Sequence, residues 1–261
     1  MKTVVVTGAA SGLGKAIAKH YGDLGWHIIV ADIQDELGQE TVTEIITTGG
    51  KATYFHCNIA KVEDFDALAD FTEQTTGQCN ILINNAGIAA SGTLMQSSED
   101  EWQRLLELDL MSCVRGSKAF IPLLKKSATV ESPNAIANVA SMAGVALMPG
   151  MMTYNVAKAA VIAFSETLRC ELKRDNIHVA AACPSFFKTN LTASMTSSNS
   201  ATIERIEGWM DKSALTSESV AKDIADGLNA KLSLIFSDHA MKKHYRRITW
   251  FYYKFMSKVF H

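Results

Sequence analysis

The sequence lacks the features that mark nucleic-acid-binding, secreted and membrane-spanning proteins. Its 25 Lys and Arg residues are outnumbered by 27 Asp and Glu residues, and the first 235 residues contain no basic cluster. We therefore expect no nucleic-acid partner, and any phosphate site must be local. The N-terminus, Met1–Val6, has no charged leader, long apolar stretch or cleavage site, which predicts a cytoplasmic protein.

Cysteine and serine patterns exclude two further classes of site. The five cysteines are an odd number, none forms a Cys-x-x-Cys pair, and most lie in apolar segments. We expect reduced core residues, with no disulfide framework and no metal site. The sequence also lacks Gly-x-Ser-x-Gly, the turn that carries the nucleophile of many hydrolases.

What is present is an alternation of short β-branched runs with longer segments of helical period. It predicts the α/β fold class: one doubly wound, mostly parallel seven-stranded sheet of Rossmann type with helices on both faces. Strands are expected at Thr3–Thr7, His27–Asp32, Ala52–Cys57, Ile81–Asn84, Ala135–Ala140, His178–Cys183 and Leu232–Phe236. Helices are expected at about Gly12–Leu24, Glu36–Thr48, Val62–Thr75, Glu99–Lys125, Thr153–Asp175 and Glu218–Lys231.

Individual residues predict how some of these helices begin or bend. Ser98 and Ser217 stand before acidic residues and are expected to be N-caps. Pro122 is expected to kink or shorten the fourth helix, because it removes a hydrogen bond and crowds the preceding turn.

No linker, repeat or low-complexity tract divides the chain, so we expect one domain over residues 1–237 and a tail over 238–261. Residues 185–216 form a long irregular stretch, which we interpret as a mobile lid over a ligand rather than a disordered insertion. The tail interleaves basic and aromatic residues. It is compatible with peripheral membrane contact, with a subunit contact, or with a cover over a ligand pocket.

A glycine-rich turn follows the first predicted strand and leads directly into a helix. Glycines there permit a tight turn, close approach of backbone N–H groups to a pyrophosphate, and close helix–strand packing. The residues of this predicted dinucleotide site are Gly8, Ser11, Gly12, Leu13 and Gly14. A glycine-rich stretch alone is also compatible with a purely structural turn.

Asp32 ends the second predicted strand, where a carboxylate can accept hydrogen bonds from both adenosine ribose hydroxyls. It would repel a 2′-phosphate, and neither Ser11 nor Ile33 offers a compensating positive charge, while Lys15 should point along its helix. The pattern therefore predicts NAD rather than NADP. The alternative is an ordinary helix-capping aspartate.

Polar residues also end the third and fourth predicted strands, at the sheet edge where open α/β folds bind ligands. There an Asn side chain can bridge neighbouring loops or touch adenine. The candidate cofactor contacts at these ends are Asn58, Ile59, Asn85, Ala86 and Gly87.

Tyr154 and Lys158 are one helical turn apart on the same face of a predicted helix. A cation beside the phenol, together with the positive nicotinamide, favours phenolate, so Tyr154 would act as an acid or base close to neutrality. Ser141 follows the fifth strand and is placed to orient a substrate oxygen. By itself, a Tyr/Lys pair on a helix is usually a surface pair.

In their order and spacing, Thr7–Gly14, Asn84–Gly87, Ser141 and Tyr154-x-x-x-Lys158 resemble the motifs of the short-chain dehydrogenase/reductase family. The resemblance spans residues 3 to about 236. It implies an NAD-dependent alcohol dehydrogenase or ketone reductase that forms a homodimer or homotetramer. It also implies that Tyr154 is the general acid–base, that Lys158 holds the nicotinamide ribose and lowers the tyrosine pKa, and that Ser141 polarises the substrate oxygen. By the same resemblance the nicotinamide carboxamide is held by the segment that contains Pro184, Ser185, Phe187 and Thr189.

Three positions depart from the family's pattern. Ser185 replaces a glycine, which narrows the pocket, and Asn58 replaces an aspartate on the adenine side. Asp109 replaces an asparagine that, in the family, helps to hold a water linking the lysine to solvent, largely through its main-chain carbonyl. Our hypothesis is that the Asp109 carboxylate also pairs with Lys158, which would raise the pH needed for alcohol oxidation.

The residues expected to face the substrate are apolar and adaptable. They are Met142, Val145, Met148, Met151, Phe186, Leu191 and Met195. Because none is charged, we expect a hydrophobic secondary alcohol or ketone rather than a sugar phosphate or carboxylate. The alternative is that several of them only pack the lid onto the core. The alternative function is a catalytically impaired dinucleotide-binding regulatory protein, for which Asp109 and Ser185 are the hints.

Overall fold

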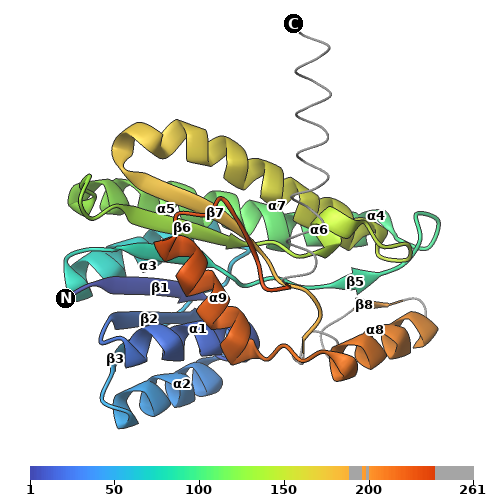
Figure 1. Ribbon diagram of the computed structural model, residues 1–261, viewed down its shortest axis with the longest axis horizontal. Helices are drawn as coiled ribbons and strands as arrows, with labels where there is room; N and C mark the ends of the chain where they lie inside the picture. The colour runs from blue at the N-terminus through green and yellow to red at the C-terminus, as the bar shows by residue number, and fades with distance from the viewer. Residues whose placement is uncertain (188–195, 198–199, 239–261) are drawn as a thin grey trace, which may run out of the picture.

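The centre of this computed structural model is a seven-stranded parallel sheet, and the structure describes residues 1–187, 196–197 and 200–238. The strands are β1 Thr3–Thr7, β2 His27–Asp32, β3 Lys51–His56, β4 Ile81–Asn84, β6 Asn134–Val139, β7 Ile177–Cys183 and β9 Leu234–Phe236. Their order is β3-β2-β1-β4-β6-β7-β9, with every neighbouring pair parallel. The predicted doubly wound sheet is confirmed (Figure 1).

Helices cover both faces of this sheet (Figure 1). On one face lie α1 Gly12–Asp23, α2 Asp35–Thr47 and α9 Ser217–Asn229. On the other lie α3 Val62–Thr76, α5 Ser112–Ser127 and α7 Met152–Glu171. Along β1, Val4 and Val6 pack against the first group and Val5 against the second, because side chains alternate across a strand.

The strand order reverses direction between β1 and β4. From β1 the chain builds outward to β2 and β3, and it then returns to β4 and builds the other half of the sheet. In doubly wound sheets this reversal opens a crevice at the carboxyl ends of the two central strands, where ligands bind. Residues 7–14 and 84–87, which follow these strand ends, therefore flank the crevice.

The predicted N-caps had different outcomes. Ser98 is the N-cap of α4, Glu99–Leu105, and its hydroxyl accepts a hydrogen bond from the backbone N–H of Glu101 at 3.2 Å. The prediction for Ser217 was wrong, because Ser217 is the first residue of α9. Thr216 is the N-cap there, in a capping box. Its hydroxyl oxygen accepts from the Ser219 backbone N–H, and its own backbone N–H donates to the Ser219 hydroxyl oxygen.

The expected continuous helix Glu99–Lys125 is interrupted, but not at Pro122. After α4 the chain forms a π-helical segment at Leu106–Met111 and then α5, which continues past Pro122 to Ser127. Proline is tolerated here because it lies on the exposed side of α5, where water can satisfy the Lys118 carbonyl that loses its N–H partner. The expectation that Pro122 shortens this helix was therefore wrong.

The stretch 185–216, expected to be irregular, contains helix α8 at Ser200–Lys212 and a short strand β8 at Thr196–Ser197 that pairs with β5, Ala90–Ser91. A further short helix, α6, spans Ala143–Ala146. Residues 188–195 and 198–199 and the tail from residue 239 lie outside the described residues. Within the described part, no helix combines the length and the apolar composition needed to cross a membrane.

Candidate active site

One cavity of about 1000 Å³ lies along the carboxyl ends of the strands. It is lined by the described residues of the predicted cofactor site: Gly8, Ser11, Gly12, Leu13, Gly14, Asp32, Ile33, Asn58, Ile59, Asn85, Ala86, Gly87, Pro184, Ser185 and Phe187. Ser141, Tyr154 and Lys158 line the same cavity. The fold thus brings together residues from distant parts of the sequence. Thr189 lies outside the described residues.

The glycine-rich turn has the backbone shape that a bound phosphate requires. Gly8 and Gly12 have left-handed φ values of 66° and 54°, which L residues rarely adopt. A Cβ on Gly14 would lie 2.0 Å from the carbonyl oxygen of Gly8, so only glycine permits this packing of α1 on the turn. The first backbone N–H groups of α1 have no partner within the helix and are available to an anion in the cavity.

Asp32 is buried at the end of β2 and also lines the cavity. Its Oδ2 accepts a hydrogen bond from the Ala10 N–H at 2.9 Å, and its Oδ1 accepts from the Gln34 N–H at 3.0 Å. The carboxylate therefore shapes the turn as well as facing the cavity. The Lys15 ammonium forms an ion pair with Glu44 Oε1 at 2.7 Å, rather than with Asp32.

Asn85 joins the ends of β1 and β4. Its side-chain amide donates to the carbonyl oxygens of Thr7 and Gly8, at 2.9 and 3.2 Å. The Thr7 hydroxyl oxygen accepts from the backbone N–H groups of Asn85 and Ala86. These bonds hold the two central strand ends together at the reversal of the sheet.

Tyr154 and Lys158 lie on the buried face of α7, one turn apart. The Lys158 ammonium lies 5.6 Å from the centre of the Tyr154 ring and donates a hydrogen bond to the Val139 carbonyl at 3.2 Å. Ser141 follows β6, and its hydroxyl oxygen accepts from the Ala143 N–H at 3.1 Å. The three side chains thus converge from two elements on one wall of the cavity.

Asp109 does not line the cavity but is buried directly behind Lys158. Its Oδ2 lies 3.3 Å from the Lys158 ammonium, and its Oδ1 accepts from the Ile88 N–H at 2.8 Å. It belongs to the π-helical segment, a kind of helical irregularity that is frequent at functional sites. A Cβ on Gly87 would lie 2.7 Å from Asp109 Oδ1 and 3.4 Å from the ammonium, so glycine leaves room for the pair.

Burial and charge act in opposite directions on these groups. Burial raises the pKa of Tyr154, Lys158 lowers it, and Asp109 adds to the rise. Burial lowers the pKa of Lys158, but the charges of Asp109 and Tyr154 outweigh burial and raise that pKa to about 12. Burial raises the pKa of Asp109 against the opposing effect of Lys158. For the chain alone, the tyrosine pKa is therefore shifted away from neutrality, opposite to the sequence-based expectation.

Sequence reasoning missed part of the cavity wall. Met142, Met148, Met151 and Phe186 line the cavity as expected, whereas Val145 does not and Leu191 and Met195 lie outside the described residues. Lining residues that were not anticipated include Ile88, Arg104, Leu108, Ile206, Met210 and Asp238. Arg104 adds a charged side chain to a wall that was expected to be uncharged. No local pattern marks Arg104 as a cavity residue, because its place on the wall depends on how α4 packs in the fold.

Comparisons with known proteins agree with this geometry. A family model described as short chain dehydrogenase matches residues 2–200. A 3-oxoacyl-[acyl-carrier-protein] reductase from Synechocystis sp. is 32% identical over 195 residues, which cover 74% of this chain and 77% of that protein. A diacetyl reductase [(S)-acetoin forming] from Staphylococcus epidermidis is 31% identical over 190 residues, or 73% of each protein.

Solved structures show the same fold. A short-chain dehydrogenase/reductase from Burkholderia phymatum in complex with NAD superposes with a TM-score of 0.87 at 26% identity, covering 94% of this chain and 92% of that one. A short-chain dehydrogenase from Sphingobium yanoikuyae in complex with NADPH gives a TM-score of 0.81 at 22% identity, covering 98% and 95%. The two solved structures contain different dinucleotides, so they do not indicate which one this chain prefers.

Proposed function

Because the chain belongs to the short-chain dehydrogenase family of oxidoreductases, we propose that it transfers a hydride between NAD(H) and a hydrophobic secondary alcohol or ketone, with Tyr154 as the general acid–base. The observation that carries this proposal is the placement of Tyr154, Lys158 and Ser141 on one wall of the cavity that also contains the glycine-rich turn. A proton-transfer group and a dinucleotide cradle thus line the same cavity.

The cavity fits a nicotinamide dinucleotide, and the β2 end favours NAD. The turn at Gly8–Gly14 leaves a cradle that side chains would fill. Beyond Asp32, the described lining residues at this end are Ile33, Gln34 and Leu37, which offer no positive charge to a 2′-phosphate. The nearest cation of α1, Lys15, is held by Glu44.

The three residues on the wall divide the proton chemistry between them. The bound nicotinamide supplies the hydride acceptor for alcohol oxidation and the hydride donor for ketone reduction. In oxidation, the Tyr154 phenolate takes the hydroxyl proton as the carbon-bound hydrogen leaves with its electron pair; in reduction, the Tyr154 phenol returns that proton to the developing alkoxide. Ser141 donates a hydrogen bond to the substrate oxygen, and the Lys158 ammonium stabilises the phenolate.

The raised tyrosine pKa bears on the direction of the reaction. A group whose pKa is raised is protonated over a wider range of pH, so Tyr154 is the acid that ketone reduction needs near neutrality. Alcohol oxidation needs the phenolate instead, and its rate should therefore rise with pH. The positive charge of the oxidised nicotinamide favours phenolate and assists oxidation.

Replacing Tyr154 with Phe tests the proposal directly. We expect kcat/KM for a panel of aliphatic, aromatic and steroid alcohols to fall about a hundred- to ten-thousandfold, because the proton acceptor is gone. NADH binding, followed by fluorescence titration, should persist. The matched control is Tyr21→Phe. Tyr21 lies in α1, outside the cavity, and its buried hydroxyl has no hydrogen-bond partner among the described residues. A regulatory protein without turnover would show no oxidation in the wild type, and equal rates in wild type and Tyr154→Phe would refute the assigned role.

A further inference from the structure

Charged residues are few on the described cavity wall, and one of them has no ion-pair or hydrogen-bond partner among the described residues. Among the described residues, Asp32, Arg104, Lys158 and Asp238 are the charged side chains that line the cavity. Lys158 is engaged by Asp109 and by the Val139 carbonyl. The Arg104 side chain, on α4, takes part in no ion pair or hydrogen bond with the described residues. An unpaired guanidinium is therefore available to an anion that enters the cavity.

The acidic residues near Arg104 on its own helix do not neutralise it. Glu101 and Glu107 are three residues before and after Arg104, the spacing at which helix side chains meet. The carboxylate of Glu101 instead accepts a hydrogen bond from the Thr153 hydroxyl at 3.0 Å, and Glu107 pairs with Arg115. Asp100, one turn before Arg104, forms no ion pair with it in the described structure. The local carboxylates therefore leave the arginine free.

Arg104 lies at the apolar end of the cavity, away from the glycine-rich turn. The next residue, Leu105, is buried in a cluster with Met151 and Tyr154. Met148, Ile206 and Met210 complete the nearby wall. In Figure 1, α4 lies at the same end of the molecule as α6, β5 and α8, opposite the end that holds α2 and β3. A molecule that extends from Tyr154 to Arg104 would thus cross hydrophobic surface and finish at a positive charge.

We propose that the substrate is amphipathic, with an apolar chain between the reacting alcohol or ketone and an anionic group, a carboxylate or a phosphate, that pairs with Arg104. This inference rests on the proposed function for the reacting end and adds the recognition of the opposite end. Arginine suits this role because its guanidinium remains protonated and matches a carboxylate or phosphate with two parallel hydrogen bonds. Arg104 is exposed, so this end of the cavity is also open to a charged group that enters from solvent.

Matched substrates with and without the negative charge test the inference. The substrates are (ω−1)-hydroxy carboxylates of increasing chain length and their methyl esters, which have nearly the same shape but no charge. We expect the wild type to prefer the acids in kcat/KM and Arg104→Gln to reduce this preference about tenfold, the effect of losing one moderate ion pair. Arg104→Lys should retain part of it. Lys118→Gln, which removes an exposed cation of α5 outside the cavity, should leave the preference unchanged.

The two hypotheses fail in different ways. Oxidation of acids and esters with the same preference in wild type and Arg104→Gln would overturn the inference and leave the proposed function standing. If no alcohol is oxidised, the proposed function fails, and calorimetric titration of the NAD-saturated protein with octanoate and octyl phosphate then decides the inference. We expect both anions to bind more weakly to Arg104→Gln than to the wild type. The anion whose affinity falls more, octanoate or octyl phosphate, identifies the group that Arg104 prefers. Equal Kd values in the two proteins would overturn the inference.

Discussion

At the scale of single residues, Asp109 has the most direct effect on the proton chemistry. Its carboxylate lies 3.3 Å from the Lys158 ammonium and raises the pKa of both Lys158 and Tyr154. Asp109→Asn removes this negative charge, so the tyrosine pKa falls and phenolate forms at lower pH. We therefore expect the rise of kcat/KM for alcohol oxidation to move to lower pH, as measured in a pH–rate profile.

Glu107→Gln is the matched control for that profile. Glu107 belongs to the same π-helical segment, but it pairs with Arg115 rather than with Lys158. Its replacement should leave the midpoint of the profile unmoved. If Asp109→Asn also left the midpoint unmoved, then Asp109 would be neutral in the working enzyme or its charge would not reach Tyr154.

Asp32 is the residue that should set the cofactor preference. Asp32→Asn removes the charge that repels a 2′-phosphate but keeps an acceptor oxygen for the turn. We expect the ratio of kcat/KM for NAD to that for NADP to fall about ten- to hundredfold, the range for one charged hydrogen bond. Asp35→Asn changes the same charge nearby, at a side chain that bonds Tyr54 and His56 and does not line the cavity, and should have little effect. Equal effects of both variants would point to general electrostatics instead of ribose recognition.

At the scale of elements, the sequence predicted those whose pattern depends on local chemistry. The strands are continuous apolar runs because both faces of the sheet are covered, and such runs stand out in sequence. Tyr154 and Lys158 follow from helical spacing, and the glycine turn from its position after β1. The π-helical segment was not predictable, because the leucines around it fit a continuous helix.

Other features of the site depend on contacts that no local pattern contains. The partner of Lys15 is in α2, and the rise of the tyrosine pKa comes from burial under the completed fold. The sequence predicted that Arg104 lies in a helix, but its exposure to the cavity depends on how α4 packs against α7. Sequence therefore predicted which residues line the cavity better than it predicted their electrostatic surroundings.

Two glycines in helices should respond to alanine in opposite ways. A Cβ on Gly14 would lie 2.0 Å from the Gly8 carbonyl oxygen, whereas a Cβ on Gly208, within α8, would meet nothing within 4 Å. We expect Gly14→Ala to lower the free energy of unfolding by about 2–4 kcal/mol and to abolish NADH binding. Gly208→Ala should raise the free energy of unfolding by about 0.5–1 kcal/mol, because alanine favours a helix. Urea denaturation and NADH titration measure both effects, and a neutral Gly14→Ala would contradict the tight packing of this turn.

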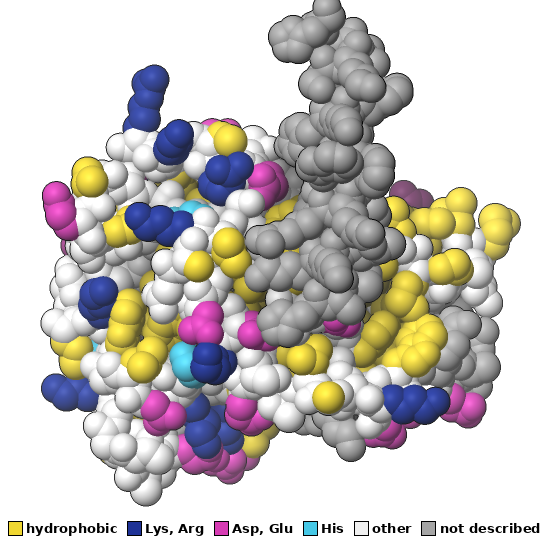
Figure 2. All heavy atoms as spheres, in the orientation of Figure 1, with side chains coloured by type: hydrophobic (Ala, Val, Ile, Leu, Met, Phe, Trp, Pro, Cys, Tyr) yellow, Lys and Arg dark blue, Asp and Glu magenta, His cyan; other side chains and the backbone are white. Residues whose placement is uncertain are grey.

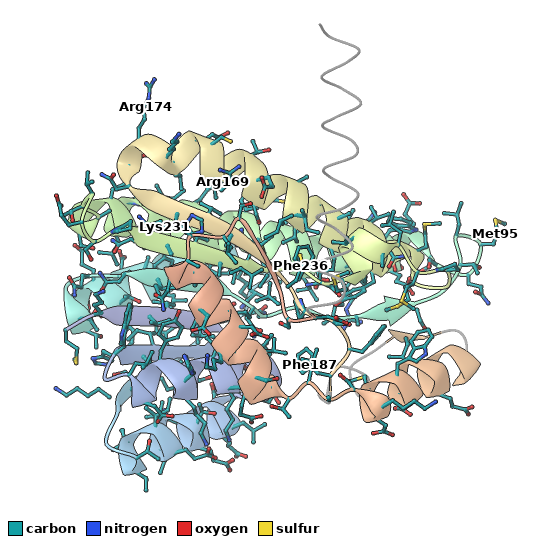
Figure 3. The ribbon with its side chains drawn as sticks, viewed as in Figure 1. Met95, Arg169, Arg174, Phe187, Lys231 and Phe236 are labelled. Atoms are coloured by element: carbon teal, nitrogen blue, oxygen red, sulfur yellow. The ribbon has the colours of Figure 1, made fainter. Side chains whose placement is uncertain are left out.

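At the scale of the whole molecule, the cavity lies at the carboxyl edge of the sheet, next to α8. Figure 3 shows Phe236, at the end of β9, in the middle of the molecule, and Met95 at its outer end, where it is 92% exposed. On the face shown in Figure 2, hydrophobic side chains gather around α8 and the region above it. Ile206 and Met210, two buried residues of the same helix, line the cavity.

A buried chain of hydrogen bonds connects this body to the helix that carries the catalytic candidates. The amide of Asn84, on β4, donates to the Asn138 side-chain oxygen at 2.8 Å, and the Asn138 amide donates to the Ser165 hydroxyl of α7 at 2.9 Å. Both asparagines are buried, and they lie side by side on β4 and β6. Asn138 therefore links two central strands to α7.

Asn138→Ala removes the middle of this chain and leaves the buried Asn84 amide without its close acceptor. Because an unpaired polar group in the core keeps its full desolvation cost, we expect the free energy of unfolding to fall by about 2–4 kcal/mol in urea denaturation. Thr167→Ala, which removes an exposed hydroxyl from the same helix, should change it by less than about 0.5 kcal/mol. A loss in Asn138→Ala as small as that of the control would mean that another group or water replaces the acceptor. In that case the attachment of α7 to the sheet would depend on apolar packing, and the position of Tyr154 would not rely on the asparagine chain.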